Sequence, residues 1–160
     1  MLANLDRLFQ NGNVKNPPGN IINQLLALYD QGHFSLVVEH CQRLVGQFPD
    51  AFIIWNILGA ASKGLGRIEE ASKAFMKVVK LNPTYADGYN NLGVSLQEQG
   101  KFEGALVAYK KAISIKPLYA EPYNNMGTIY KDQDELEKAS GVFKKAISIK
   151  PNYAEAYNNL

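Results

Sequence analysis

A period of 34 residues runs through most of the chain, and it limits the folds that the chain can adopt. Prolines, aromatic residues and glycines each recur at this spacing. The prolines are Pro49, Pro83, Pro117 and Pro151, the aromatic residues are Trp55, Tyr89, Tyr123 and Tyr157, and the glycines are Gly59, Gly93 and Gly127. A period of roughly 20–50 residues is typical of a stack of similar units, in which each unit buries its apolar face against its neighbours.

Each unit carries the apolar pattern of a helix twice. Tyr89, Leu92, Gly93 and Leu96 stand at i, i+3, i+4 and i+7, which places them on one face of a helix. The polar stretch QEQGK follows, and a second helical pattern begins after it. This second pattern is formed by Phe102, Ala105, Leu106, Tyr109, Ala112 and Ile113. Because a proline disfavours the helical conformation of the residue before it, Pro117 is expected to end the second helix. The sequence therefore predicts pairs of antiparallel helices that approach closely at Gly93 and Ala105.

This unit resembles the tetratricopeptide repeat (TPR) in its length and in its motif. Counted from Ala86, the aromatic residue is fourth, Leu-Gly occupies positions 7 and 8, alanine is at 20 and proline at 32. Three units match well, at 52–85, 86–119 and 120–153, and residues 154–160 match the start of a further one. The resemblance implies an all-α fold, a right-handed superhelical solenoid of antiparallel helix pairs.

The N-terminal third of the chain fits this frame less well. Residues 18–51 keep the glycine and proline of the motif, but Leu25 replaces the small residue of the first helix and Val37 replaces the alanine of the second. We expect a degenerate repeat with wider helix separation there, as is common in terminal units. Residues 1–17 are expected to form a short amphipathic helix and a linker.

One side of each first helix carries polar residues opposite the core stripe. At about 100° per residue, positions 2, 5, 6, 9, 12 and 13 of the unit lie together. In TPR proteins the first helices line the concave surface, so the resemblance implies a peptide-binding groove there. The predicted binding residues are Asn56, Asp87, Asn90, Asn91, Gln97, Glu98, Glu121, Asn124, Asn125, Thr128, Lys131, Asn158 and Asn159.

The paired asparagines of the motif YNN are the most distinctive of these residues. An amide side chain both donates and accepts hydrogen bonds, so a column of amides can bind the backbone of an extended peptide. Asn91, Asn125 and Asn159, at position 6, are similar in this to the TPR region of O-linked N-acetylglucosamine transferase. Two other readings stay open: the amides bond neighbouring helices, or they persist from a recent duplication of the repeat.

Other chemistry has little support in the sequence. His33, His40 and Cys41 lie on the second helix of the degenerate repeat without a third ligand at metal spacing, and we interpret Cys41 as a packed core thiol. No catalytic residue, metal site or cofactor is predicted. The net charge of +2 gives no argument for nucleic acid, and no apolar run of about 18 residues predicts a membrane span. A cytoplasmic protein is expected.

The predicted function is a non-catalytic scaffold that binds an extended peptide or protein segment, neutral or basic in character, in the concave groove. One alternative is the N-terminal module of a larger sulfotransferase or glycosyltransferase whose catalytic domain is absent here, since the repeats also resemble those of such enzymes. A third is homotypic assembly. Residues 154–160 supply only about two turns of a first helix, so we expect a fragment of a longer array whose open C-terminal end self-associates.

Overall fold

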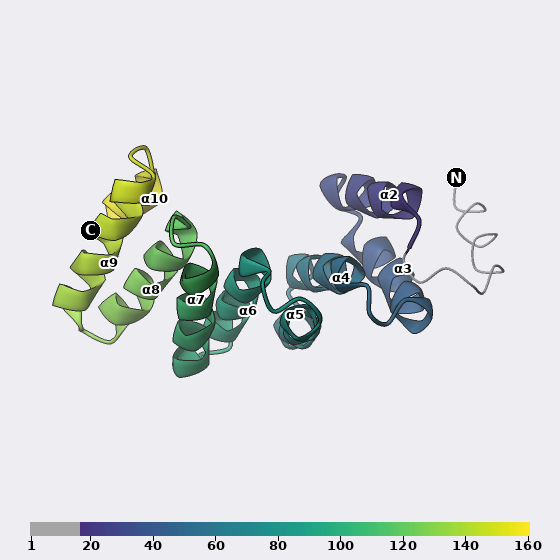
Figure 1. Ribbon diagram of the computed structural model, residues 1–160, viewed down its shortest axis with the longest axis horizontal. Helices are drawn as coiled ribbons and strands as arrows, with labels where there is room; N and C mark the ends of the chain where they lie inside the picture. The colour runs from purple at the N-terminus through teal and green to yellow at the C-terminus, as the bar shows by residue number, and fades with distance from the viewer. Residues whose placement is uncertain (1–16) are drawn as a thin grey trace.

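A computed structural model describes residues 17–160, and all regular structure in that range is helical (Figure 1). The helices follow one another as an elongated array of antiparallel pairs. Their bounds are α2 Gly19–Asp30, α3 Phe34–Gln47, α4 Phe52–Gly64, α5 Ile68–Leu81, α6 Ala86–Glu98, α7 Phe102–Ile115, α8 Ala120–Asp132, α9 Leu136–Ile149 and α10 Ala154–Asn159. The short helix predicted near the N-terminus lies outside the described residues. Within them, the predicted all-α array of helix pairs is confirmed.

The turn inside each pair is three residues long, and its middle residue has a positive φ. Gly32, Gly66 and Gly100 have φ angles of 76°, 73° and 71°. Asp134 occupies the equivalent place in the last complete pair with φ 60°. Glycine adopts this conformation without strain because it lacks a Cβ atom, whereas aspartate does so at some cost.

Within each pair, an aromatic ring of the second helix packs directly on a glycine of the first. A Cβ atom on Gly93 would lie 2.5 Å from Cε1 of Tyr109, and one on Gly59 would lie 2.7 Å from Cε1 of Phe75. Gly127 and its partner ring repeat the arrangement in the next pair. Tyr109 is fully buried. At the close approach predicted at Gly93, the glycine therefore makes room for the buried ring of Tyr109.

The first described pair has the opposite distribution of volume. Leu25 takes the position of the glycine, and Cys41 takes the position of the aromatic ring. Both are fully buried in one apolar cluster. A larger side chain on the first helix is thus matched by a smaller one on the second, which explains how a unit that departs from the motif still has a closed core.

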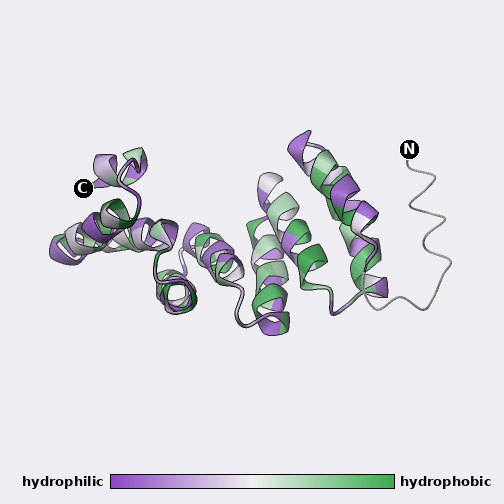
Figure 2. Cartoon of the chain, turned by 45° about the horizontal axis from the view of Figure 1, so that its top comes forward, coloured by the Kyte–Doolittle hydropathy of each residue, from purple (hydrophilic) through white to green (hydrophobic). Residues whose placement is uncertain are grey.

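Successive pairs are joined by packing and by hydrogen bonds at their junctions. Each second helix contacts the first helix of the next pair, and neighbouring first helices also contact one another. Nε1 of Trp55 donates a hydrogen bond to the carbonyl oxygen of Pro49 at 2.9 Å, at the start of its pair. Figure 2 shows hydrophobic and hydrophilic residues alternating along the helices of the array. This alternation leaves a polar face on each first helix beside its buried one.

Candidate functional site

The polar face of the first helices forms a continuous strip along the array, which we call the inner surface. We define it by Asn56 on α4, Asn91 and Gln97 on α6, and Asn125 and Thr128 on α8. Because α4, α6, α8 and α10 contact each other in sequence, these faces are brought next to one another. The predicted binding residues on these helices therefore share one side of the array.

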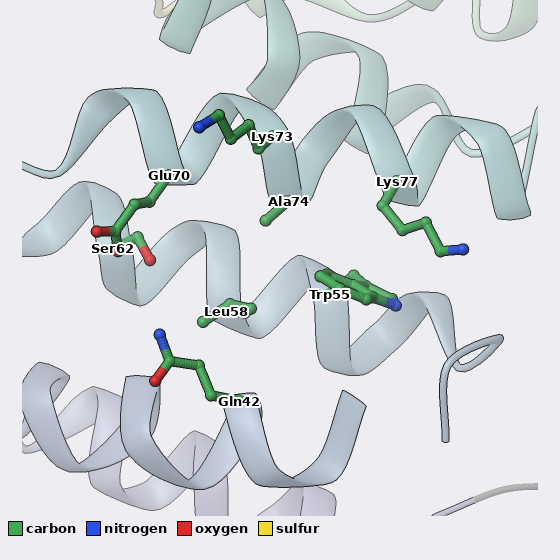
Figure 3. A pocket seen from close by; sticks show the side chains of 8 residues that line it. All are labelled: Gln42, Trp55, Leu58, Ser62, Glu70, Lys73, Ala74 and Lys77. Atoms are coloured by element: carbon green, nitrogen blue, oxygen red, sulfur yellow. The ribbon is translucent and has the colours of Figure 1, made fainter. Parts of the chain in front are cut away.

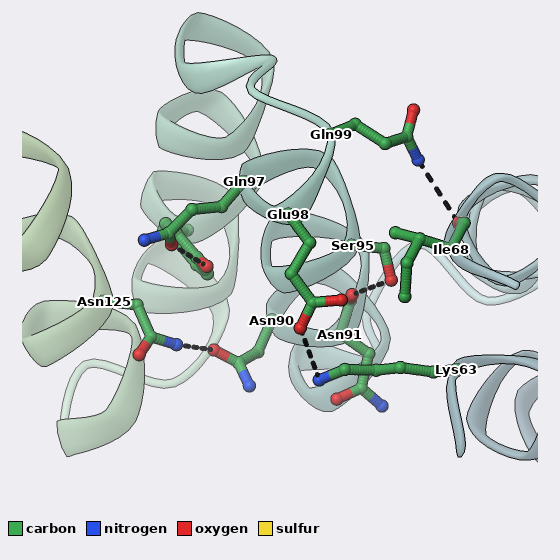
Figure 4. Close-up of polar contacts among 10 residues, drawn as sticks. Lys63, Ile68, Asn90, Asn91, Ser95, Gln97, Glu98, Gln99 and Asn125 are labelled. Carbon is green, nitrogen blue, oxygen red and sulfur yellow. Dashed lines mark hydrogen bonds and ion pairs between the residues drawn. The ribbon is translucent and has the colours of Figure 1, made fainter. Parts of the chain in front are cut away.

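Amides of neighbouring pairs are hydrogen-bonded across this surface. Nδ2 of Asn91 donates to Oδ1 of Asn56 at 3.5 Å. Nδ2 of Asn125 donates to Oδ1 of Asn90 at 3.3 Å, as Figure 4 shows. Nδ2 of Asn159 donates to Oδ1 of Asn124 at 3.1 Å. In each case the sixth residue of one unit donates to the fifth residue of the unit before it. The bonding of neighbouring helices, left open by the sequence, is thus present.

The two asparagines of the YNN motif differ in burial on α6 and α8. Asn124 is 0% exposed and Asn90 is 9% exposed, whereas Asn91 and Asn125 are half-buried. Nδ2 of Asn124 also donates to Oε1 of Glu155 at 2.9 Å. On α6 and α8 the fifth residue is therefore an internal link between units, and the sixth residue lies at the edge of the inner surface.

The sixth residue keeps one hydrogen-bonding atom free. The amide oxygens of Asn91, Asn125 and Asn159 accept no hydrogen bond from any residue in the described part of the chain. The donated N–H fixes the plane of each amide, so each oxygen is held in a set direction. The result is one oriented acceptor per repeat.

Gln97 is held in place by a chain of hydrogen bonds between two pairs. Its Oε1 accepts a bond from the hydroxyl of Tyr109 at 2.8 Å, and its Nε2 donates to Oγ1 of Thr128 at 2.9 Å. Thr128 in turn donates to the carbonyl oxygen of Asn125 at 2.8 Å. Burial and the negative charge of Glu98 raise the pKa of Tyr109 above its usual value, while a hydrogen bond with Asn125 opposes that rise. The tyrosine hydroxyl therefore stays protonated and orients the glutamine.

A hollow of about 540 Å³ opens beside these residues. Val94 and Phe102 supply its apolar lining. The other lining residues are amides, a hydroxyl and carboxylates: Gln97, Asn125, Thr128, Glu98, Asp132 and Glu155. No lysine or arginine is among its described lining residues, although Nζ of Lys63 approaches Oε1 of Glu98 to 3.3 Å from α4 (Figure 4). The hollow is thus acidic, and part of its lining is apolar.

Some of the predicted binding residues have other surroundings. Asp87 and Glu121 lie near the tyrosines that end their own units: Asp87 contributes to the raised pKa of Tyr119, and Glu121 pairs with Lys150 at 3.6 Å. Nζ of Lys131 donates to the carbonyl oxygen of Asn159 at 3.0 Å. Asn158 is exposed, and its side chain has no partner in the described part of the chain.

Four lining residues of the hollow are outside the predicted set: Val94 and Asp132 occupy positions 9 and 13 of the polar side, whereas Phe102 and Glu155 were missed. Phe102 begins a second helix, and its place in the apolar pattern pointed only to the core. Glu155 follows the junction between units, where Asp87 and Glu121 stand in the preceding units. The spacing of Glu155, one unit after Glu121, was a signal for a position near the surface, but the approach of Asn124 to it depends on how the units stack.

The groups considered for other chemistry lie apart from this surface. His40 and Cys41 are buried in the second helix of the first described pair, and His33 is exposed at its start. Burial raises the pKa of the Cys41 thiol to about 12, so it stays protonated at neutral pH. Within residues 17–160, no group of three or more His, Cys, Asp or Glu is arranged to hold a metal ion. In the same range, none of the helices combines the length and apolarity that crossing a bilayer requires.

The stacked helix pairs and the polar inner surface define a helical repeat protein. A family model described as "TPR repeat" matches residues 59–100, 96–134 and 127–160, which together make up more than half of the chain. The chain belongs to the TPR repeat family. Such repeats typically present extended surfaces for protein partners and are generally non-catalytic.

Solved structures support the same assignment. One described as "Crystal structure of MamA" is 28% identical to this chain, with a TM-score of 0.76 over 84% of this chain and 81% of that one. "MamA 41-end from Desulfovibrio magneticus RS-1" has a TM-score of 0.78 at 20% identity, covering 86% of this chain and 78% of that one. "Arabidopsis OM64 TPR domain" has a TM-score of 0.66 at 21% identity, covering 68% and 89%. The last two likenesses show the fold alone. Among curated proteins, none matches this chain.

Proposed function

We propose that this protein is a scaffold whose inner surface binds an extended segment of a partner protein through the segment's backbone. The observation that supports this proposal is the row of oriented amide oxygens on Asn91, Asn125 and Asn159, each fixed by a bond to the preceding unit and each without a donor in the described chain. The backbone N–H groups of an extended peptide are suitable donors to such a row of oxygens. Recognition of this kind is independent of side chains.

The charge of the adjacent hollow selects among such segments. Glu98, Asp132 and Glu155 line it, and Lys63 offsets part of this charge through its contact with Glu98. A lysine or arginine side chain of the ligand would enter an acidic site with apolar walls, where its methylene groups pack and its charge is compensated. The preferred ligand is therefore a neutral or basic segment.

A peptide library with backbone changes tests this proposal. Extended ten-residue peptides captured by the purified chain are resynthesised with single N-methylated backbone amides, which removes one donor and leaves every side chain in place. We expect particular N-methylations to weaken binding by about tenfold. Equal affinity for every N-methylated peptide would show that the oxygens are not used.

Variants of the chain supply the matching half of the experiment. Asn91→Ala combined with Asn125→Ala removes two of the acceptors, and Asn20→Ala combined with Asn152→Ala changes two exposed asparagines away from the inner surface. Only the first pair is expected to weaken peptide binding. Melting temperatures are recorded for both pairs, so that loss of folded protein is not counted as loss of binding.

The two other functions considered from the sequence stay predictions. These are a module of a larger transferase and self-association through the C-terminal end. The contacts described above do not bear on either one, and the partner's identity is a question for the library.

A further inference from the structure

A second hollow, of about 460 Å³, lies on the other side of α4, and we call it the outer pocket. It is lined by residues of α3, α4 and α5, among them Trp55, Leu58 and Ser62 on α4 (Figure 3). At about 100° per residue these three point away from Asn56, which belongs to the inner surface. The outer pocket is therefore separate from the proposed peptide groove.

One lining residue of the outer pocket is smaller than its counterparts in the next two units. Ser62 occupies the eleventh position of its unit, where the next two units carry Leu96 and Tyr130. Both of these larger side chains are half-buried and pack in an apolar cluster of their own units. Ser62 is smaller than either of them, and it is a buried lining residue of the outer pocket.

Ser62 also brings a polar atom without a partner. Its side chain is 0% exposed, and its Oγ makes no hydrogen bond in the structure. A buried hydroxyl without a partner is costly, by about 1–3 kcal/mol for a group of this kind. A ligand that fills the pocket and bonds to this hydroxyl would remove that cost.

The two ends of the pocket differ in chemistry. Figure 3 shows Ser62 and Glu70 at one end, Trp55 and Lys77 at the other, and Leu58 between them. Ser62 follows Trp55 by seven positions, which correspond to about 10 Å along the helix. The indole N–H of Trp55 is already used in its bond to Pro49, so its ring offers only an apolar face.

The pocket carries two lysines, Lys77 beside the indole ring and Lys73 on the side of Glu70 (Figure 3). Nζ of Lys77 lies 6.0 Å from the centre of the Trp55 ring, and Lys73 also lines the pocket. Glu70 is about half exposed and has Arg67 as its ion-pair partner at 3.7 Å, a surface contact that contributes little. Its carboxylate oxygens therefore stay available to accept a hydrogen bond from a neutral donor.

We propose that the outer pocket binds a tyrosine side chain from an acidic segment of a partner protein. The ring packs between Leu58 and the Trp55 face. The phenol hydroxyl meets Ser62 and Glu70 and exchanges hydrogen bonds with them. Carboxylates flanking the tyrosine in the partner lie beside Lys73 and Lys77. A phosphorylated tyrosine would bring its negative charge to Glu70 and is excluded.

Trp55 allows a direct measurement, because it is the only tryptophan of the 160 residues. The whole chain is titrated with the peptide acetyl-Glu-Glu-Tyr-Glu-Glu-amide, and Trp55 emission is followed with excitation selective for tryptophan. We expect a saturable change that weakens at high salt. The same peptide with alanine in place of tyrosine is expected to bind at least about tenfold more weakly, and the phenylalanine peptide about three- to tenfold more weakly.

Variants connect the signal to the pocket. Ser62→Leu copies Leu96 and fills the volume, so it is expected to abolish the titration while the circular dichroism and melting temperature show a folded chain. Ser62→Ala keeps the volume and removes the hydroxyl, so tyrosine and phenylalanine peptides are expected to bind alike. Lys73→Gln with Lys77→Gln is expected to weaken binding, whereas the exposed pair Lys144→Gln with Lys145→Gln serves as the charge-matched control.

Three results would overturn the proposal. Equal binding of the alanine peptide would mean that the lysines attract acidic peptides without using the pocket. Undiminished binding to a folded Ser62→Leu variant would place the peptide elsewhere. Binding of free 3-(4-hydroxyphenyl)propionate as tight as that of the peptide would assign the pocket to small aromatic acids instead of a partner protein.

Discussion

The side-chain amide of Asn125 donates a hydrogen bond to the side-chain oxygen of Asn90 in the preceding repeat, at 3.3 Å. The bond joins two asparagines of the same motif that have different surroundings, since Asn90 is buried and Asn125 lies at the edge of the inner surface. The buried one fixes the direction of the half-exposed one. The same contact thus joins two neighbouring repeats and orients an amide of the inner surface.

A matched pair of substitutions separates these two roles. Asn90→Ala removes a buried acceptor, and we expect it to lower the free energy of unfolding by about 1–3 kcal/mol. Asn91→Ala is expected to cost about 1 kcal/mol or less, because its partner Asn56 is half-buried and water can replace the lost bond. Urea unfolding of both variants measures the difference. Equal losses would contradict the distinction drawn here between the two asparagines.

The sequence alone predicted the repeats and the side of the array that carries the amides. The 34-residue spacing predicted two antiparallel helices in each unit, since apolar periodicity and the prolines agree. It could not separate Asn90 from Asn91, because adjacent residues on one polar face differ in burial only through the placement of the next unit. The sequence also did not predict the outer pocket, because Ser62 is an ordinary small polar residue in the sequence and the positions of its neighbours are given only by the structure.

The turn at Asp134 offers a second prediction. Asp134 has φ 60°, where the equivalent turns have Gly66 and Gly100. Asp134→Gly relieves the strain of a Cβ atom in this conformation, although it also gives the unfolded chain more freedom. We expect a net gain of about 0.5–1 kcal/mol in the free energy of unfolding. Thermal unfolding measures it, and the reciprocal change Gly100→Asp is expected to lower stability.

Two tyrosines with raised pKa values predict a loss of stability at alkaline pH. Burial, followed by the charge of Glu98, raises the pKa of Tyr109, and burial, followed by the charges of Glu155 and Glu121, raises that of Tyr153 to about 12. Above about pH 10 the unfolded chain releases these protons while the folded chain retains them. Their contribution is therefore complete below about pH 10 and is lost as the pH rises through the folded-state values.

A single substitution tests that prediction. Tyr109→Phe copies Phe75 and Phe143, which occupy the same position in the neighbouring units. Denaturant unfolding between about pH 9 and pH 12 is expected to show a smaller fall in stability for this variant than for the original chain. Lysine titration affects both proteins equally and does not account for a difference. An identical fall in the two proteins would show that the Tyr109 hydroxyl is not part of the effect.

The contact between Gly93 and Tyr109 gives the last prediction, in which the same chemical change has opposite effects at two sites. In Gly93→Ala the new methyl group would lie 2.5 Å from the Tyr109 ring, closer than carbon atoms approach in a folded protein, and the ring is fully buried. The helices then have to separate, and we expect a loss of about 1–3 kcal/mol. Gly141 lies on an exposed face of α9, and nothing beyond its chain neighbours and the backbone of its own helix lies within 4 Å of an added Cβ atom, so Gly141→Ala is expected to stabilise the helix by up to about 1 kcal/mol. Thermal unfolding compares the two variants.

Adding Tyr109→Leu to Gly93→Ala is expected to cost less than the sum of the two single changes, since the smaller side chain gives the methyl group room. Strict additivity in this double-mutant cycle would show that the ring does not require the glycine.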